Sequence, residues 1–392
     1  FQAEDGIRDR SPSRGLGDVY KRQYQFLLGG CSDQEVLRVS HGNLVRTYTV
    51  ANIPTIGPNL RFQLTHNSRD NFLGTLGRNW RHNGMAKLTF AGVPVNLVTF
   101  TDESGRPYDF QWNASTSTWE LTVDSLFLRK TLTQVGAQWH LAEFADGDTM
   151  IFDSLGQLEQ IVNSHGQALT FSYSGGLLTA ITEPTGRALT LTYTAGMLTK
   201  VVDPNSNETL FGMDANSNLV SIIGPDGCEL SYGYAPGSTN GLILSRTDPR
   251  NNTYQYTYFG DGALATLTNP ASHTLVYSYD QVLESSSQPH LGQNRLLTRT
   301  RLVDAEGHTW DFRFDRYGNL WRILDPLQHC KRLYWSDQQT LLYISEGYGL
   351  NSGGTLGPLD SPYNLYRRNL FDSLGNHTAS ICLLYTSPSP RD

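Results

Sequence analysis

The sequence lacks the runs of Lys, Glu and Ala that build long helices, and it holds no apolar run as long as a membrane span. It also lacks basic clusters, because 37 acidic residues outnumber 30 Lys and Arg and the formal net charge is −7. A chain without a basic patch has no electrostatic footprint for nucleic acid. Its abundant Gly, Tyr, Thr and Leu suit strands and tight turns. We therefore expect an all-β protein that binds no nucleic acid.

Cysteine is also scarce. Apart from Cys382 near the end of the chain, only Cys31, Cys228 and Cys330 are present, and their spacing is not that of metal ligands. An odd number of cysteines makes no closed disulfide framework. We expect these thiols to be buried or incidental, and we predict neither a metal ion nor another cofactor.

Both ends of the chain read as translated sequencing adapter. Residues 1–23 and 382–392 match library-primer sequence read in frame, and the chain opens at Phe1 without an initiator Met. Such scars are excluded from fold reasoning. We interpret residues 24–381 as an internal fragment of a longer gene of metagenomic origin.

The strongest pattern in the chain is a motif of about twenty residues that recurs between Asn163 and Pro326. Each copy has an aromatic-x-aromatic strand, a glycine turn followed by a hydrophobic run, and an acidic turn with proline. The turn prolines are 20, 21, 24, 21 and 56 residues apart, at Pro184, Pro204, Pro225, Pro249, Pro270 and Pro326. Self-similarity at such a period signals a repeat architecture.

Two sets of repeat residues are predicted to have structural roles. The strand aromatics should form the core, and they are Phe171, Tyr173, Tyr193, Tyr232, Tyr234, Tyr256, Tyr258, Tyr277, Tyr279, Phe312 and Phe314. The turn residues should close the hairpins, and they are Glu183, Pro184, Gly186, Asp203, Pro204, Pro225, Gly227, Asp248, Pro249, Pro270, Asp325 and Pro326.

Each repeat is expected to be one β-hairpin. The segment Glu183-Pro-Thr-Gly186 fits a type I turn, with an acceptor side chain first, proline second and glycine fourth. In the second strand the hydrophobic residues are three apart, as at Leu178 and Ile181. Either a bulge or burial on both faces would explain this spacing. Because one hairpin is marginal in water, stability should belong to the stacked array.

The chain divides by pattern into an ordered series of segments. Residues 24–99 alternate in short stretches that predict antiparallel strands, and residues 100–162 continue with more aromatic strands that lead into the repeats. Residues 163–381 hold the repeats, with surface loops near 281–294 and 351–362. We find no convincing helix.

These motifs resemble the YD-repeat, or RHS-repeat, family. Tyr279-Asp280, Phe152-Asp153, Phe314-Asp315 and Phe371-Asp372 stand at the dipeptide that names the family. The front, with Gly42-Asn-Leu44, Thr65-His-Asn-Ser-Arg69 and Gly74-Thr-Leu-Gly-Arg-Asn-Trp80, resembles the segment that precedes the repeats in bacterial members. Some copies depart from the pattern: Gly224 and Ala305 replace turn residues, and Asn251, Ser272 and Gln328 replace the final Gly.

The resemblance implies that the hairpins wind into a spiral sheet that closes as a hollow shell. In bacterial members the shell encloses a variable C-terminal segment, often a toxin, so the implied partner is the missing C-terminal part of the same chain. The resemblance also implies a secreted or cell-surface location, with secretion machinery or surface glycans as further partners. Our interpretation is therefore a shell segment without catalysis of its own.

Two rivals stay open at this point. The first is a cell-surface adhesin or carbohydrate-binding repeat protein without cargo, which outward-facing aromatics and a polar interior would favour. The second is a toxin with self-processing protease activity, which would need a cleavage motif beyond Ile381.

Individual chemical motifs are weak. The acidic turn residues Glu183, Asp203, Asp248 and Asp325 are too sparse for a calcium site and should cap their turns. His82 has no partner at metal-ligand spacing, so we expect a structural role. Ser285-Ser-Ser287 lacks a nucleophile elbow, and Gly353-Gly-Thr-Leu-Gly357 lacks the Lys-Ser/Thr of a phosphate loop. We predict no catalytic, cofactor-binding or metal-binding residue in this fragment.

Overall fold

The computed structural model describes residues 25–27, 33–122, 130–143, 147–284, 295–315, 318–327, 329–335, 341–348, 365–371 and 377–383. Two compact units divide the chain. The larger unit comprises Leu27–Tyr279 and Arg301–Thr309, and the smaller one comprises Phe1–Phe26, Asp280–Thr300 and Trp310–Asp392. Of the adapter-like residues 1–23 and 382–392, all but Cys382 and Leu383 lie outside the described residues, as do most of the predicted loops at 281–294 and 351–362.

The described part of the chain is all-β, as predicted, and its helical content is one 3₁₀ turn, η1 (Asn83–Met85). An N-terminal sheet in the larger unit has the antiparallel order β2–β3–β4–β7. Its strands are β2 (Asp33–Arg38), β3 (Asn43–Ile53), β4 (Leu60–Asn67) and β7 (Trp80–His82), and the same unit has the short strands β5 (Leu73–Gly74) and β6 (Gly77–Arg78). Strand β1 (Gln25–Leu27) spans the point in the sequence where the two units divide.

A long antiparallel sheet follows, in which each strand from β8 to β26 pairs with the next one along the chain. Its strands in the larger unit are β8 (Lys87–Ala91), β9 (Leu97–Thr101), β10 (Pro107–Asn113), β11 (Thr118–Leu121), β12 (Lys130–Val135), β13 (Gln138–Glu143), β14 (Thr149–Phe152), β15 (Leu158–Val162), β16 (Ala168–Ser174), β17 (Leu177–Thr182), β18 (Ala188–Thr194), β19 (Met197–Val202), β20 (Glu208–Met213), β21 (Leu219–Ile223), β22 (Glu229–Gly233), β23 (Ser245–Thr247), β24 (Thr253–Tyr258) and β25 (Leu264–Thr268).

The remaining strands continue the same hairpin pattern. In the smaller unit, consecutive antiparallel pairs run from β28 to β33. The strands are β26 (Thr274–Glu284), β27 (Arg295–Val303), β28 (Thr309–Phe314), β29 (Leu320–Leu324), β30 (His329–Trp335), β31 (Leu341–Tyr348), β32 (Leu365–Phe371) and β33 (His377–Leu383).

A β-bulge explains the three-residue spacing that the sequence left open. In the hairpin β16–β17 the register shifts so that Ser172 faces Ala180 while Tyr173 faces Leu178, which leaves Thr179 as the extra residue. The Thr179 hydroxyl donates a hydrogen bond to the Ser172 carbonyl oxygen at 3.1 Å. Because the extra residue reverses the alternation, Leu178 and Ile181 both point to the buried face. The bulge recurs at the same place in β18–β19, β20–β21, β24–β25 and β28–β29.

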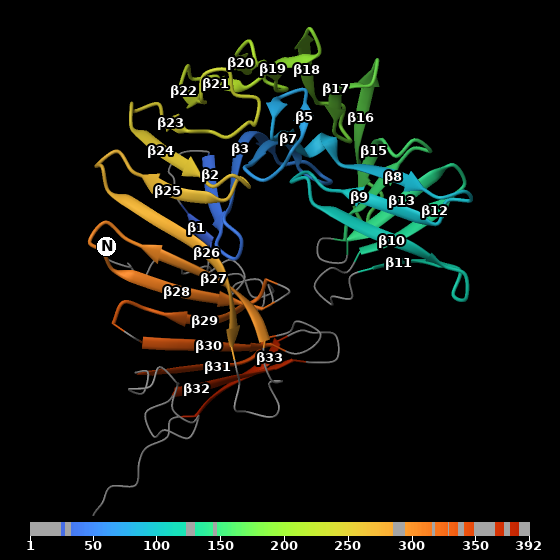
Figure 1. Cartoon of the computed structure of the whole chain (residues 1–392). Coiled ribbons are helices and arrows are strands. Elements are labelled where there is room, and N and C mark those ends of the chain that lie inside the picture. Colours follow the sequence, from blue (N-terminus) through green and yellow to red (C-terminus); the bar gives the residue numbers. More distant parts are fainter. Residues whose placement is uncertain are drawn as a thin grey trace, which may run out of the picture. The chain divides into compact units, whose positions relative to one another are not determined.

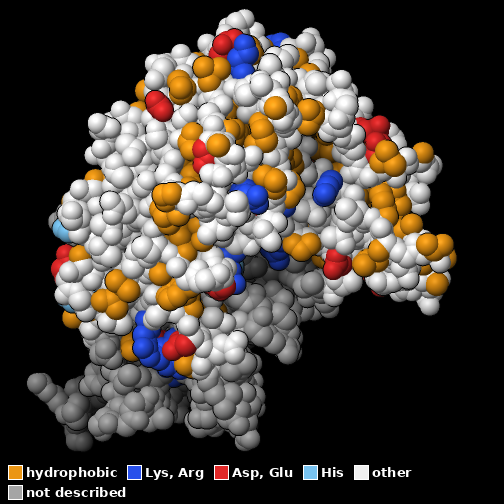
Figure 2. Space-filling model, turned by 45° about the horizontal axis from the view of Figure 1, so that its top comes forward, with side chains coloured by type: hydrophobic (Ala, Val, Ile, Leu, Met, Phe, Trp, Pro, Cys, Tyr) orange, Lys and Arg blue, Asp and Glu red, His pale blue; other side chains and the backbone are white. Residues whose placement is uncertain are grey.

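The core of the larger unit lies between the N-terminal sheet and one face of the repeat strands. Figure 1 shows β3, β5 and β7 (blue) beside the repeat strands β16 to β24 (green to yellow). On this face Phe171, Leu191 and Tyr232 are buried. The alternate positions, such as Ser172 and Thr192, are exposed. In Figure 2 the surface hydrophobic side chains (orange) are scattered in small groups among polar atoms.

Candidate functional site: the seam between the N-terminal sheet and the repeats

Several acidic hairpin turns are stabilised by the side chain of their first residue. One carboxylate oxygen of Asp203 accepts the backbone N–H groups of Asn205 (2.8 Å) and Asn207 (2.9 Å), and the other accepts the side-chain amide of Asn207 (2.9 Å). Burial alone would raise the pKa of Asp203, but these hydrogen bonds outweigh it and the pKa is lowered. The same clamp recurs at Asp214–Asn218, Asp248–Asn252 and Asp315–Asn319. The Asp-to-Asn spacing of four residues was visible in the sequence, but its meaning was missed.

Glu183 closes its turn with a longer side chain. Its carboxylate accepts hydrogen bonds from the Thr185 hydroxyl and from the backbone and guanidinium N–H groups of Arg187 (both 3.1 Å). These bonds, led by the one from Thr185, hold the pKa of Glu183 at about 2. The Gly186 N–H donates to the Glu183 carbonyl oxygen, and Gly186 has a φ of +94°. A type I turn followed by a left-handed fourth residue is a common three-residue hairpin loop.

The fourth turn position is left-handed in each of the five repeat turns with Pro184, Pro204, Pro225, Pro249 and Pro270. Gly227 has a φ of +75°, and the worn copies carry Ser206, Asn251 and Ser272 with φ of +67°, +67° and +63°. The hairpin geometry therefore survives the loss of glycine. The last proline turn, with Asp325 and Pro326, cannot be followed to its end because Gln328 lies outside the described residues.

Where the second aromatic residue of a repeat is tyrosine, its hydroxyl ties one hairpin to the hairpin before it. The Tyr173 hydroxyl donates to the Leu158 carbonyl oxygen at 2.9 Å, and the Tyr193 hydroxyl donates to that of Leu178 at 2.8 Å. The same bond spans fifteen residues from Tyr234 to Leu219, Tyr258 to Ile243 and Tyr279 to Leu264. Burial raises the pKa of all five tyrosines. We predicted these rings as core residues and did not foresee their hydrogen bonds.

The first aromatic residue of each repeat is the more deeply buried one. Phe171, Tyr232, Tyr256 and Tyr277 are at most 5% exposed. In the smaller unit Phe312 and Phe314 are both buried. Leu191 takes this place in the repeat that ends with Tyr193.

The N-terminal segment joins the repeats through backbone hydrogen bonds. The Leu198 N–H donates to the Thr75 carbonyl oxygen at 2.7 Å, and the Leu264 N–H donates to that of Gly42 at 2.8 Å. At Gly77 the two backbones approach so closely that a Cβ atom would collide with the Ser217 carbonyl oxygen. The glycines of the front segment are thus needed where the chain touches successive hairpins.

A charged pair lies fully buried in this seam. The Arg46 guanidinium lies 3.1 Å from a carboxylate oxygen of Glu35, and the two side chains are 0% and 2% exposed. The Tyr256 hydroxyl donates to the same oxygen at 2.9 Å. The guanidinium also lies 4.9 Å from the ring centroid of Tyr256 and 5.6 Å from that of Tyr232. A buried charge is tolerated only with such compensation.

Trp80 and His66 belong to the same seam, and their rings lie 5.1 Å apart. The Trp80 ring lies 5.3 Å from that of Tyr232, and its Nε1–H donates to the Tyr234 hydroxyl at 3.3 Å. His66 Nε2 donates to the Gly241 carbonyl oxygen at 2.9 Å. Burial, followed by the charge of Arg46, lowers the pKa of His66 to about 3, so the imidazole is neutral at pH 7.

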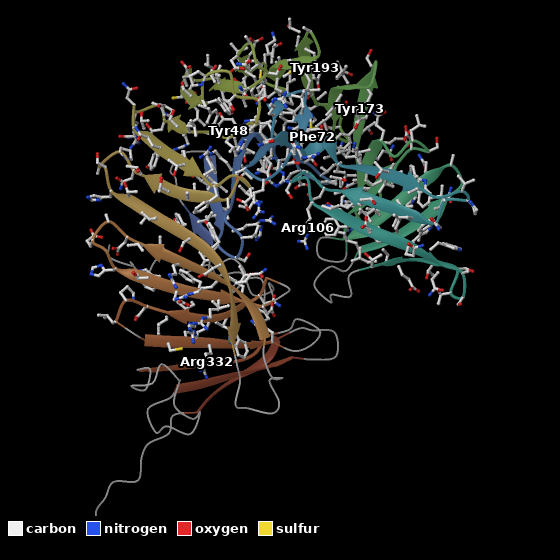
Figure 3. All side chains as sticks on the ribbon, in the orientation of Figure 1. Tyr48, Phe72, Arg106, Tyr173, Tyr193 and Arg332 are labelled. Atoms are coloured by element: carbon white, nitrogen blue, oxygen red, sulfur yellow. The ribbon has the colours of Figure 1, made fainter. Side chains whose placement is uncertain are left out.

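His82, for which we expected a structural role, lies in the core of the larger unit. It is 2% exposed, its ring lies 5.0 Å from that of Phe62, and burial lowers its pKa to about 3. It borders a cavity of about 290 Å³ whose walls are mainly aromatic and aliphatic, including Phe72, Met85, Tyr173, Leu178 and Tyr193. Figure 3 shows Phe72, Tyr173 and Tyr193 close to one another in this part of the unit.

The described residues form no catalytic constellation. The nearest approach to one is the exposed pair of Ser40 Oγ and His41 Nδ1, which are 2.7 Å apart. Burial and the charges of Arg38 and Arg69 lower the pKa of His41 to about 4. A nucleophile–base pair needs a carboxylate that stabilises the imidazolium, and these cations do the opposite.

One group of potential metal ligands occurs among the described residues. Ligand atoms of Asp304, Glu306 and His308 lie within 4.8 Å of one another, and two of the three side chains are exposed. Asp304 accepts the backbone N–H groups of Glu306 and His308, as the other turn acids do. The group is therefore accounted for as a hairpin turn.

The fold is an array of β-hairpin repeats, and in the larger unit an N-terminal segment is bound to the repeats. A family model described as "Teneurin YD-shell" matches residues 102–316, more than half of the chain, and the chain belongs to this family. A second model, described as "Domain of unknown function (DUF6531)", matches residues 36–110. The YD-repeat identification made from the sequence is confirmed.

Solved structures of low similarity also match. "Crystal Structure of TcdB2-TccC3 without hypervariable C-terminal region" is 10% identical with a TM-score of 0.35, and the match covers 87% of this chain and 22% of that one. "Crystal Structure of TcdB2-TccC3-TEV" is 9% identical with the same TM-score, and the match covers 87% and 23%. This chain thus spans less than a quarter of the length of these structures. No curated protein matches it. No helix among the described residues is long and apolar enough to cross a membrane.

Proposed function

We propose that this chain is a shell segment of a large exported or surface-displayed bacterial protein, and that the shell encloses and delivers a C-terminal effector. The observation that carries the proposal is the direction of the repeat aromatics. Phe171, Tyr232 and Tyr256 are buried on the face toward the N-terminal segment, whereas the opposite positions carry small polar residues such as Ser172 and Thr192. An apolar inner face is what an enclosing wall requires.

Membership of the YD-shell family supports the same proposal. This segment forms part of the shell wall and catalyses no reaction. Any toxin or self-processing activity therefore belongs to sequence C-terminal to it. The effector is the partner of this wall, and the protein acts outside the cell that makes it. The segment boundaries at residues 99 and 162 mark where the N-terminal segment passes into the repeats.

Recovery of the full reading frame from the source DNA, followed by limited proteolysis of the expressed protein, tests this proposal. If the shell encloses an effector, the C-terminal segment stays uncut in the native protein and is cut once urea has unfolded the shell. The isolated C-terminal segment serves as the control. Equal cleavage rates for the attached and isolated segments, or a frame that ends in a surface anchor, would contradict the proposal.

A second candidate function is carbohydrate binding at the cell surface. A row of indole rings supports it: Trp112, which is 38% exposed, lies 5.3 Å from Trp119, and Trp119 lies 5.4 Å from Trp139. The rings are tilted against one another at 58° and 66°, which suits cross-strand packing better than a flat platform for sugars. Glycan-array binding that Trp112→Ala abolishes would favour this candidate over the shell.

A further inference from the structure

The cavity of about 290 Å³ that His82 borders is walled by both the N-terminal segment and the repeats of the larger unit. Phe72 comes from the N-terminal segment, whereas Tyr173 on β16 and Tyr193 on β18 come from the repeats. Figure 3 shows these three side chains close together. A cavity of about 150 Å³ is enough to hold benzene. The space in this protein therefore fits a compound of about two fused rings.

The walls of this cavity are held in place by the protein's own hydrogen bonds. The Tyr173 and Tyr193 hydroxyls donate to backbone carbonyl oxygens of the preceding hairpins at 2.9 Å and 2.8 Å. The Leu88 N–H donates to the Gly156 carbonyl oxygen at 2.9 Å, and both of these residues line the cavity. A preformed cavity loses little conformational freedom when a ligand binds.

Most of the cavity wall is apolar, and part of it reaches the surface. Met85, Leu158, Leu177 and Leu178 line the cavity, and Leu155, which also borders it, is 83% exposed. Ordered water needs about two to four polar partners, which aliphatic and aromatic walls do not supply. An apolar ligand therefore gains more from this space than water does.

The charged groups of the wall do not favour an ionised ligand. The Arg81 guanidinium lies 2.6 Å from a carboxylate oxygen of Asp70 and 3.7 Å from the ring centroid of Phe72, so its charge is already compensated. Lys87 is exposed to water. Burial lowers the pKa of His82 to about 3, so its imidazole is neutral at pH 7. An environment that keeps a histidine neutral also disfavours an ionised ligand.

His82 supplies a polar group that the fold leaves unused. It is 2% exposed, and neither of its ring nitrogens has a hydrogen-bond partner among the described residues. Nδ1 is enclosed, because a Cβ atom on Gly84 would lie only 3.2 Å from it. Nε2 is therefore the nitrogen that remains for a ligand. Since a hydroxyl both donates and accepts, it matches Nε2 in either neutral form of the imidazole.

We propose that this cavity binds a neutral aromatic compound of about two fused rings that carries one hydroxyl group. The rings of the ligand pack against Phe72, Tyr173 and Tyr193, and its hydroxyl forms a hydrogen bond with His82 Nε2. This site does not depend on the enclosing role of the shell, because all of its walls belong to the larger unit.

Equilibrium dialysis of the whole chain against 2-naphthol at pH 7 tests the site. This probe has two fused rings and one hydroxyl and is neutral at that pH. We expect saturable binding of one molecule per chain. The carboxylate 2-naphthoate should bind about tenfold more weakly or worse, because an ionised group loses its hydration in the cavity.

Met85→Trp should weaken 2-naphthol binding about tenfold or more, because the larger side chain fills the space that the ligand needs. Met85 is half-buried, so its side chain has room to change size without unfolding the unit. Met213→Trp is the matched control, because Met213 is also half-buried in the larger unit and does not line the cavity. Its affinity should stay within about twofold of the unmodified chain.

His82→Phe keeps a ring and removes both nitrogens. It should weaken binding of 2-naphthol about fivefold and leave binding of 2-methylnaphthalene, which lacks the hydroxyl, within about twofold. This variant is first checked for an unchanged melting temperature, and Met85→Trp keeps the test valid if His82→Phe does not fold. The proposal is overturned if 2-naphthol does not bind, if 2-naphthoate binds as tightly, or if Met213→Trp weakens binding as much as Met85→Trp. Equal effects of a folded His82→Phe variant on the two neutral probes would also overturn it.

Discussion

The repeat hairpins and the N-terminal sheet share one buried face, yet they stabilise it by different means. The hairpins repeat the same local hydrogen bonds. A turn acid, a bulge residue and a tyrosine hydroxyl each bond to backbone groups near the surface. The N-terminal sheet contributes single residues without copies, namely the buried Glu35–Arg46 pair, His66, Trp80 and His82. When one hairpin loses such a bond, the equivalent bonds in the other hairpins remain. When the seam loses one of these side chains, no equivalent contact remains.

The largest effect is expected at the buried ion pair. Glu35→Ala removes the carboxylate that faces Arg46 and the Tyr256 hydroxyl, and an uncompensated buried charge costs about 3–5 kcal/mol. Urea unfolding measures the loss. The control is Glu208→Ala, which removes an exposed pair with Lys200 and should cost less than about 1 kcal/mol. If both variants lose the same stability, the seam is no more critical than the outer surface.

Acid should weaken the seam before it weakens the hairpins. Burial lowers the pKa values of His66 and His82 to about 3, so below the unfolded value of 6.5 the unfolded chain binds protons that the folded chain does not. Each histidine should thus cost about 2 kcal/mol of stability between pH 6.5 and pH 5. The turn acids have lowered pKa values, so their contribution is lost only as the pH falls below about 4.

Unfolding measured at several pH values checks this order. The double variant His66→Gln with His82→Gln should have a flatter profile between pH 6.5 and pH 5 than the unmodified chain, whatever its stability at pH 7. An unchanged slope would mean that other groups titrate in this range.

A smaller effect is expected from the tyrosine bonds of the repeats. Tyr258→Phe removes the hydrogen bond to the Ile243 carbonyl oxygen and should cost about 1 kcal/mol. Tyr254, on the same strand, has no hydroxyl hydrogen bond to a described residue, and Tyr254→Phe should cost almost nothing. Thermal unfolding of the two variants compares them. Equal melting temperatures would show that the fifteen-residue bond adds no stability.

The smallest effect lies within the repeats themselves. Ala195 has a φ of +50°, and Gly175 takes the same place in the preceding hairpin with a φ of +57°. The left-handed strain at alanine slightly exceeds the entropy cost of glycine, so Ala195→Gly should stabilise the chain by about 0.5 kcal/mol. Gly175→Ala should destabilise it by a similar amount. A destabilising Ala195→Gly would mean that the two turns are not equivalent.

Much of the repeat architecture could be predicted from the sequence, because it is local. An acceptor, a proline and a glycine at fixed spacing specify a turn, and the aromatic alternation specifies the neighbouring strand. The cause of the three-residue spacing between Leu178 and Ile181 could not be predicted. A β-bulge and burial on both faces of the strand give the same spacing of hydrophobic residues. The Asp203–Asn207 clamp is equally local and could have been found from its recurrence.

The sequence by itself determined the all-β class, the repeat period and the family, because these depend on contacts between residues close along the chain. Only the tertiary structure decided which residues of the front segment matter. Glu35 and Tyr256 are far apart in sequence, as are His66 and Gly241, and no periodicity links them. They meet because the apolar face of the repeats must be covered, and the N-terminal sheet covers it with side chains whose charges and hydrogen bonds fit that place alone.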